Sequence, residues 1–261
     1  MTNKRRSQTI TSIAMLLGIL AFANRAEAAG YLLTEQPGNY QSGGCSPNTD
    51  VPDYSYPIRN GLAGLGWSNT FLTGANAWPQ DFVDPGDYAD QFDVTVFLGH
   101  GNTGRLYFST PQNGLCSTGA SSMQMGAGTG AKVSSAVFMA CCFMEISHQD
   151  LLVNHQFEKQ LMGFGGVSSL DAGMVNNYWD GTGSSSNVDS WLNNMEDKPG
   201  WFTGDNTTTV LSRGQSQDEL NWNHWYCGLK RQNCVTGGPG GSYWYLDWHW
   251  NGCGGCDECP G

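Results

Sequence analysis

Two apolar segments of the chain each end in a residue that can take part in covalent catalysis. Residues 94–98 lead into His100 and Gly101, and residues 136–140 lead into Cys141. Short apolar runs of this kind are typical of buried strands. Two such strands, parallel and side by side, bring their last residues to the sheet edge where open α/β proteins bind ligands. A thiol beside an imidazole is the minimal arrangement for nucleophilic catalysis by cysteine, so the pattern indicates a His100–Cys141 dyad.

The reactivity of this pair depends on the thiol and on the backbone around it. A thiol with the ordinary pKa of about 8.5 is mostly protonated at neutral pH, and a neighbouring imidazole stabilises its thiolate. The backbone N–H groups of Gly101 and Cys141 are expected at the strand ends, where they can bind a developing oxyanion. Gly101 also has no side chain to obstruct a carbonyl substrate. The alternative is an ordinary buried cysteine and a simple turn at His100, and the sequence identifies no residue that orients His100.

The elements expected around the dyad are those of a mostly parallel sheet. Strands are predicted at 31–34, 67–72 and 164–170, and helices within 57–71, at 147–162 and at 187–195. The second helix is predicted because Val153, Phe157 and Leu161 recur every four residues, and Gly163 is expected to end it. A strand, a helix and a strand in succession imply a right-handed parallel unit. Residues 109–130 are poor in large apolar side chains and are expected to form a long loop.

The first 28 residues have the features of a secretory signal peptide. A basic start is followed by an apolar run at 13–23, too short to cross a bilayer, and by the small-x-small sequence Ala26-Glu27-Ala28. An uncleaved amphipathic start is the alternative. No later stretch is apolar for long enough to span a membrane. We therefore expect an exported protein, extracellular or periplasmic, with no membrane attachment after signal cleavage.

The charge balance of the mature chain restricts its partners. Cleavage after Ala28 leaves 8 basic and 22 acidic residues, a net charge of −14. Phosphate binding needs a basic surface, so nucleic acid is not expected as a partner. The balance suits a secreted protein and is compatible with cationic substrates or calcium, although no metal site is predicted.

Nine cysteines are many for a chain of 261 residues. Export favours disulfides, and the odd number leaves at least one thiol. If Cys141 is the nucleophile, eight disulfide candidates remain: Cys45, Cys116, Cys142, Cys227, Cys234, Cys253, Cys256 and Cys259. A buried, unpaired Cys142 is the alternative. The Cys-x-x-Cys-x-x-Cys spacing at 253–259 also suits a metal, but disulfides are favoured in an exported chain.

The domain organisation follows from a change of composition near residue 220. Residues 1–28 are the signal peptide, 29–219 form an α/β domain, and 220–261 are expected to be a disulfide-stapled, irregular extension rich in cysteine and tryptophan. The tryptophans of this extension are expected to cover the domain, with stacking on sugars as the alternative.

The two blocks around the dyad resemble those of a known group of enzymes. Val-Phe-Leu-Gly-His-Gly at 96–101 and Val-Phe-Met-Ala-Cys at 137–141 are similar to the paired blocks of the caspase–legumain–gingipain (clan CD) cysteine peptidases. The resemblance implies a three-layer, caspase–haemoglobinase-like α/β fold with a mostly parallel sheet between helices. It makes His100 the general base, Cys141 the nucleophile and Gly101 an oxyanion-hole donor, with no cofactor.

The block after the dyad extends the resemblance to substrate binding. Residues 163–169 resemble the strand and loop that help to line the specificity pocket, which implies substrate-binding roles for Ser168, Ser169 and, for a basic side chain, Asp171. A solvated loop carboxylate is the alternative for Asp171. With Asn-Ala-Trp-x-x-Asp-Phe at 76–82, the blocks resemble most closely an uncharacterised family of secreted domains related to the peptidases.

These observations lead to one main hypothesis and two alternatives. The main hypothesis is a secreted cysteine-peptidase-like hydrolase that cleaves peptide or protein substrates by its His/Cys dyad. The first alternative is a catalytically inactive binding or scaffold module of the same fold. The second is a carbohydrate-binding surface on the aromatic C-terminal extension.

Overall fold

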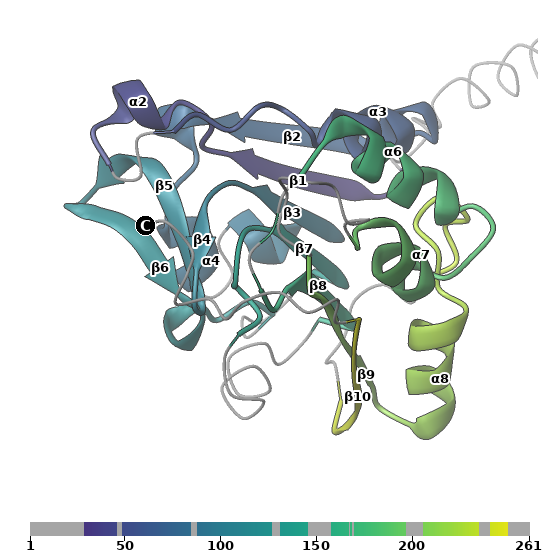
Figure 1. Ribbon diagram of the computed structural model, residues 1–261. Helices are drawn as coiled ribbons and strands as arrows, with labels where there is room; N and C mark the ends of the chain where they lie inside the picture. Colours follow the sequence, from purple (N-terminus) through teal and green to yellow (C-terminus); the bar gives the residue numbers. More distant parts are fainter. Residues whose placement is uncertain are drawn as a thin grey trace, which may run out of the picture.

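A seven-stranded sheet forms the centre of the computed structural model, in the order β2-β1-β3-β7-β8-β9-β10 (Figure 1). Its strands are β1 (Tyr31–Gln36), β2 (Ser68–Thr73), β3 (Val94–Leu98), β7 (Ser135–Met139), β8 (Gln160–Phe164), β9 (Thr208–Gly214) and β10 (Tyr243–His249). The first five in spatial order are parallel, whereas β9 and β10 are antiparallel to their neighbours. The predicted α/β class with a mostly parallel sheet is confirmed.

The structure describes most of the chain in nine stretches. These are 29–45, 49–84, 88–126, 131–145, 158–166, 168, 170–196, 206–234 and 241–249. The predicted signal peptide lies outside them. Within these stretches, no helix is long and apolar enough to cross a membrane.

Both faces of the sheet are covered, which explains the unbroken apolar runs of its central strands. One face packs against α3 (Tyr56–Gly64), α6 (Ala172–Gly181) and α7 (Asn187–Asn194). The other packs against α4 (Gln80–Val83) and β5 (Arg105–Gln112). In β3, Val96 and Leu98 belong to the hydrophobic cluster between the sheet and these three helices, while Phe97 belongs to the cluster on the opposite face. A strand buried on both faces has no polar side, so its apolar run is continuous.

Residues 101–119 form a small antiparallel sheet, so the long loop predicted at 109–130 is wrong for residues 109–119. β4 (Gly101–Asn102), β5 and β6 (Leu115–Gly119) pair in that order. Asn113 and Gly114 connect β5 to β6 with φ angles of 51° and 78°. Positive φ at both central residues is typical of a type I′ hairpin turn, which Asn-Gly favours. The small sheet and its hairpin therefore lie in the stretch of chain that connects His100 to Cys141.

Strand β8 corrects two further predictions. It occupies 160–164, so the helix predicted at 147–162 is wrong for its last residues, and the strand predicted at 164–170 begins four residues too late. Gly163 does not end a helix but lies within the strand, where an added Cβ would meet Met144 Cγ at 2.6 Å. Short apolar runs do not distinguish a buried strand from a helix by spacing alone. Residues 146–157, with most of the predicted helix, lie outside the described residues.

The region after residue 216 is more ordered than its composition indicates. It contains α8 (Gln217–Trp225) and β10, which pairs with β9 from Tyr243 to His249. The predicted irregular extension is therefore wrong for these two segments, and the boundary at 219/220 falls inside α8. Few side chains of α8 are buried, so it has little apolar periodicity. The other strands and helices expected near 31–34, 67–72, 57–71 and 187–195 are present as β1, β2, α3 and α7.

Candidate functional site

His100 and Cys141 follow neighbouring strands at the same edge of the sheet. β3 and β7 pair in parallel over their full lengths, and Gly99 N donates to Met139 O at 3.2 Å just beyond the strands. A Cβ built on Gly101 would lie 2.5 Å from Cys141 O. The His-Gly and Ala-Cys blocks are thus in contact, and only glycine at position 101 allows so close an approach.

The imidazole of His100 is held at its outer nitrogen by a backbone group. His100 is partly exposed, and its Nε2 lies 2.6 Å from the carbonyl oxygen of Thr49. A carbonyl oxygen only accepts hydrogen bonds, so Nε2 carries a proton. In the neutral ring Nδ1 is then the basic nitrogen. The carbonyl of Thr49 is the orienting group that the sequence did not reveal, because a backbone acceptor leaves no side-chain signal.

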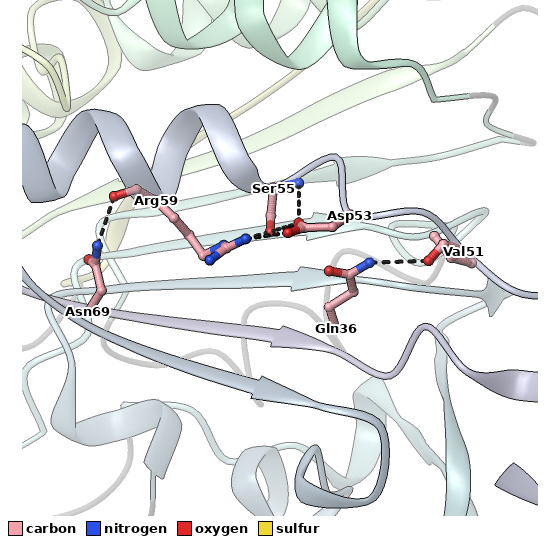
Figure 2. A network of polar contacts seen from close by, with 6 residues as sticks. All are labelled: Gln36, Val51, Asp53, Ser55, Arg59 and Asn69. Carbon is pink, nitrogen blue, oxygen red and sulfur yellow. Dashed lines mark hydrogen bonds and ion pairs between the residues drawn. The ribbon is translucent and has the colours of Figure 1, made fainter.

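The segment that carries Thr49 is fixed to the end of β1 and to α3. Gln36 Nε2 donates to Val51 O at 3.1 Å, as Figure 2 shows. In the same figure Arg59 of α3 pairs with Asp53, which lies four residues after Thr49. These bonds place the carbonyl acceptor of His100 on a supported loop rather than a loose one.

Cys141 is a partly exposed thiol surrounded by polar atoms of Ser168. The backbone N, Oγ and backbone O of Ser168 each lie 3.4 Å from Sγ. The amide and the hydroxyl can donate to the sulfur, and the thiol can donate to the carbonyl oxygen. The structure thus places Ser168, predicted in a specificity pocket, in direct contact with the candidate nucleophile.

The neighbouring cysteine has a different role. Cys142 is fully buried, has a φ of 55° and is disulfide-bonded. Its N donates to Gly166 O at 2.8 Å, which ties the turn after β7 to the loop after β8. Of these two neighbouring cysteines, Cys141 is therefore the candidate nucleophile.

The remaining candidates differ in how the structure places them. Asp171 is exposed and caps α6, where its carboxylate accepts from Met174 N at 2.9 Å. That contact gives Asp171 a structural role, while contact with a basic substrate group stays a prediction. Ser169 lies outside the described residues.

Besides the bond of Cys142, two disulfides join pairs of cysteines within the described residues. Cys45 is bonded to Cys116, and Cys227 to Cys234. The first bond joins the segment before Thr49 to the β6 strand of the hairpin. Cysteines 253, 256 and 259 lie outside the described residues. Disulfides of this kind are typical of an oxidising compartment.

A buried pair of carboxyl groups gives the acidic residue of the 76–82 segment a structural role. Glu35 at the end of β1 is fully buried, and Asp81 of α4 is 7% exposed. Burial, then the charge of the neighbouring Asp81, raise the pKa of Glu35 well above 4.5. The pair joins α4 to the sheet and is too deeply buried to meet a substrate.

His224 also has a structural environment. It is 2% exposed, and its Nδ1 lies 2.9 Å from Ser212 Oγ while Nε2 lies 3.9 Å from Asp247. Burial lowers its pKa, although the charge of Asp247 acts in the opposite direction. The imidazole joins α8 to β9 and β10. Across the described stretches, no three His, Cys, Asp or Glu side chains are grouped to hold a metal ion.

One sequence family matches the chain. Its description is "Domain of unknown function (DUF6345)", and the match covers residues 55–209, more than half of the 261. The matched part extends from the start of α3 into β9 and includes both His100 and Cys141. Comparison with curated proteins finds no match.

Proposed function

The chain belongs to this family of unknown function, and we propose that it is an exported cysteine-peptidase-like hydrolase with a His100–Cys141 dyad. The observation that carries the proposal is the contact between the two strand-end blocks, with an added Gly101 Cβ only 2.5 Å from Cys141 O. The fixed protonation of His100 Nε2 by the Thr49 carbonyl supports it, because this leaves Nδ1 as the base. The disulfides and the signal-like N-terminus support export.

The proposed reaction is acyl transfer through a thioester. Nδ1 of His100 takes the proton of Cys141, and the thiolate attacks the peptide carbonyl to form a carbon–sulfur bond. Backbone N–H groups of Gly101 and Cys141 bind the oxyanion. The carbon–nitrogen bond then breaks, and the imidazolium returns its proton to the leaving amine. Water, deprotonated by His100, hydrolyses the thioester and restores the thiol.

A relationship to the caspase–haemoglobinase fold is part of the same proposal. A mostly parallel sheet, covered on both faces and carrying His-Gly and Cys at the ends of adjacent strands, suits the caspase–haemoglobinase fold. The antiparallel β9 and β10 are additions at one edge of that sheet. Ser168 and Asp171 lie after β8 and are proposed to meet the substrate.

A survey of a random peptide library tests the proposed activity. The wild type is expected to cleave a subset of peptides, and Cys141→Ala is expected to cleave none, since it lacks the nucleophile. Because Cys141 is half-buried, its replacement by alanine can affect the fold, and circular dichroism checks this. Equal cleavage by both proteins would exclude Cys141 as the nucleophile, and no cleavage by the wild type would favour a non-catalytic binding module.

An exposed group of aromatic side chains supports a second function, carbohydrate binding. Trp225 of α8 is 48% exposed, and Tyr243 and Tyr245 of β10 are 46% and 38% exposed. The rings of Trp222 and Tyr226 are stacked with centroids 5.6 Å apart. Flat aromatic faces beside polar groups suit the C–H faces and hydroxyls of sugars.

Retention on insoluble polysaccharide tests this second function. Trp225→Ala is expected to weaken retention, whereas Cys141→Ala is expected to leave it unchanged. Tyr56→Ala, which removes an exposed aromatic ring from α3, is the matched control. Retention that is equal in all three variants and the wild type, or absent from the wild type, would exclude a role for this surface.

A further inference from the structure

Tyr40 is a fully buried side chain that contacts His100 in two ways. It lies in α2 (Tyr40–Gly43), a single helical turn that follows β1. Its hydroxyl oxygen accepts a hydrogen bond from His100 N at 3.1 Å. Its ring stands edge-on to the imidazole, with centroids 4.6 Å apart and planes at 71°. One side chain therefore contacts both the backbone and the ring of the candidate base.

The two partners of the Tyr40 hydroxyl fix the direction of both of its hydrogen bonds. The hydroxyl lies 2.6 Å from Tyr107 O, a carbonyl that only accepts, so its proton points there. Its lone pair is left for His100 N, which only donates. Tyr107 N donates in turn to His100 O at 3.0 Å, so both backbone groups of His100 are engaged. Burial raises the pKa of Tyr40, which keeps the hydroxyl neutral and able to donate.

The segment around Tyr40 is fastened to the hairpin that follows His100. Cys45 is bonded to Cys116 of β6, and Cys45 N donates to Ser109 O at 3.1 Å. An added Cβ on Gly43 would lie 2.0 Å from the same carbonyl oxygen, so α2 is in close contact with β5. Tyr40 before the disulfide and Thr49 after it thus approach His100 from one anchored segment.

We propose that Tyr40 is a positioning residue whose hydroxyl and ring, with the Thr49 carbonyl, hold the His100 imidazole in the orientation that leaves Nδ1 available as a base. Its importance for catalysis rests on the proposed function, whereas its effect on the imidazole does not. A tyrosine that merely fills space would be replaced by phenylalanine without consequence for His100.

The test compares Tyr40→Phe with Tyr178→Phe. Tyr178 is also fully buried, but among the described residues its hydroxyl has only the thioether of Met162, at 3.8 Å, as a hydrogen-bond partner. The first measurement is the ¹⁵N spectrum of the His100 imidazole, which reports its tautomer and protonation. The second is the rate of Cys141 alkylation by iodoacetamide against pH, which reports the thiolate.

Tyr40→Phe is expected to change the His100 nitrogen shifts and to slow alkylation at neutral pH by about tenfold or more, because a misoriented base stabilises the thiolate less. Tyr178→Phe is expected to match the wild type in both. Wild-type behaviour of Tyr40→Phe in both measurements would overturn the proposal.

The two proposals fail separately. If His100→Ala is alkylated at the wild-type rate, the dyad is wrong. The nitrogen spectra of the wild type and Tyr40→Phe then still decide whether Tyr40 orients the ring. If wild-type alkylation does depend on His100 but Tyr40→Phe changes nothing, the dyad stands and the positioning role is wrong. Should Tyr40→Phe not fold, cross-relaxation between the Tyr40 and His100 ring protons of the wild type is expected, and its absence would overturn the proposal.

Discussion

Gly101 is the residue whose replacement reports most directly on the contact between the two strand ends. An added Cβ would lie 2.5 Å from Cys141 O, a backbone atom that cannot turn away as a flexible side chain can. We expect Gly101→Ala to lower the free energy of unfolding by about 1–3 kcal/mol, the usual cost of overpacking. Urea denaturation measures this change.

Gly64→Ala is the control for Gly101→Ala. Gly64 is the last residue of α3, and an added Cβ there would meet nothing within 4 Å. Alanine reduces the freedom of the unfolded chain, so this variant is expected to be as stable as the wild type or up to about 1 kcal/mol more stable. Equal stability of the two variants would contradict the close contact at Gly101.

At this scale the sequence identifies the candidate reacting side chains but not the groups that hold them in place. His100, Gly101 and Cys141 are identified by residue type at the ends of apolar runs. The Thr49 carbonyl and the Tyr40 hydroxyl act from a segment rich in glycine, serine and proline that has no periodicity. Their contacts depend on how the chain returns to the sheet, which local patterns do not encode.

Among the secondary-structure elements, the junction of β1 and α4 makes a prediction about pH. Glu35 has a raised pKa in the folded protein, mainly through burial and then through Asp81. The folded state therefore binds this proton more tightly than the unfolded state. As pH rises from about 4.5 towards the folded pKa, the free energy of unfolding is expected to fall.

Glu35→Gln tests this dependence, because glutamine does not titrate and can donate to Asp81. Urea denaturation at a series of pH values is expected to show a weaker decline for the variant than for the wild type. Glu145→Gln, which changes an exposed carboxylate, is expected to leave the decline unchanged. A wild-type decline that persists in Glu35→Gln would show that the buried pair is not its cause.

The prediction of elements succeeds where tertiary structure and local pattern agree. The continuous apolar runs at 94–98 and 136–140 predict buried strands, which β3 and β7 confirm. β8 is missed in part because Leu161 fits both a helical repeat and a strand. The β5–β6 hairpin carries a local signal, Asn113-Gly114, but the small polar residues around it indicate a loop.

For the whole molecule, the disulfides Cys45–Cys116 and Cys227–Cys234 are expected to contribute unequally to stability. Cys45 and Cys116 are 71 positions apart, whereas Cys227 and Cys234 are 7 apart. Closing a longer loop removes more entropy from the unfolded chain. Replacing both cysteines by alanine is expected to cost about 4 kcal/mol for the first pair and about 2 kcal/mol for the second. Urea midpoints measure this, and a larger loss for the second pair would contradict the loop-entropy account.

The overall architecture shows what composition alone can and cannot predict. Alternation of apolar runs along the chain predicts the mostly parallel sheet, and the cysteine count indicates the disulfides. The many tryptophans after residue 220 prevent the prediction of α8 and β10. Exposed aromatic residues on a helix and an edge strand do not form the apolar face from which an element is predicted. The sheet therefore continues into a region that composition marks as separate.

Covalent labelling with a peptidyl acyloxymethyl-ketone probe tests the His100–Cys141 dyad most directly, because the probe reacts with a thiolate in a peptidase-like site. The label is expected on the peptide that contains Cys141, identified by mass spectrometry, with none in Cys141→Ala and much slower labelling in His100→Ala. Heat-denatured protein is the control for non-specific reaction. A folded wild type that takes no label between pH 5 and 9, or labelling that is unchanged in His100→Ala, would contradict the dyad.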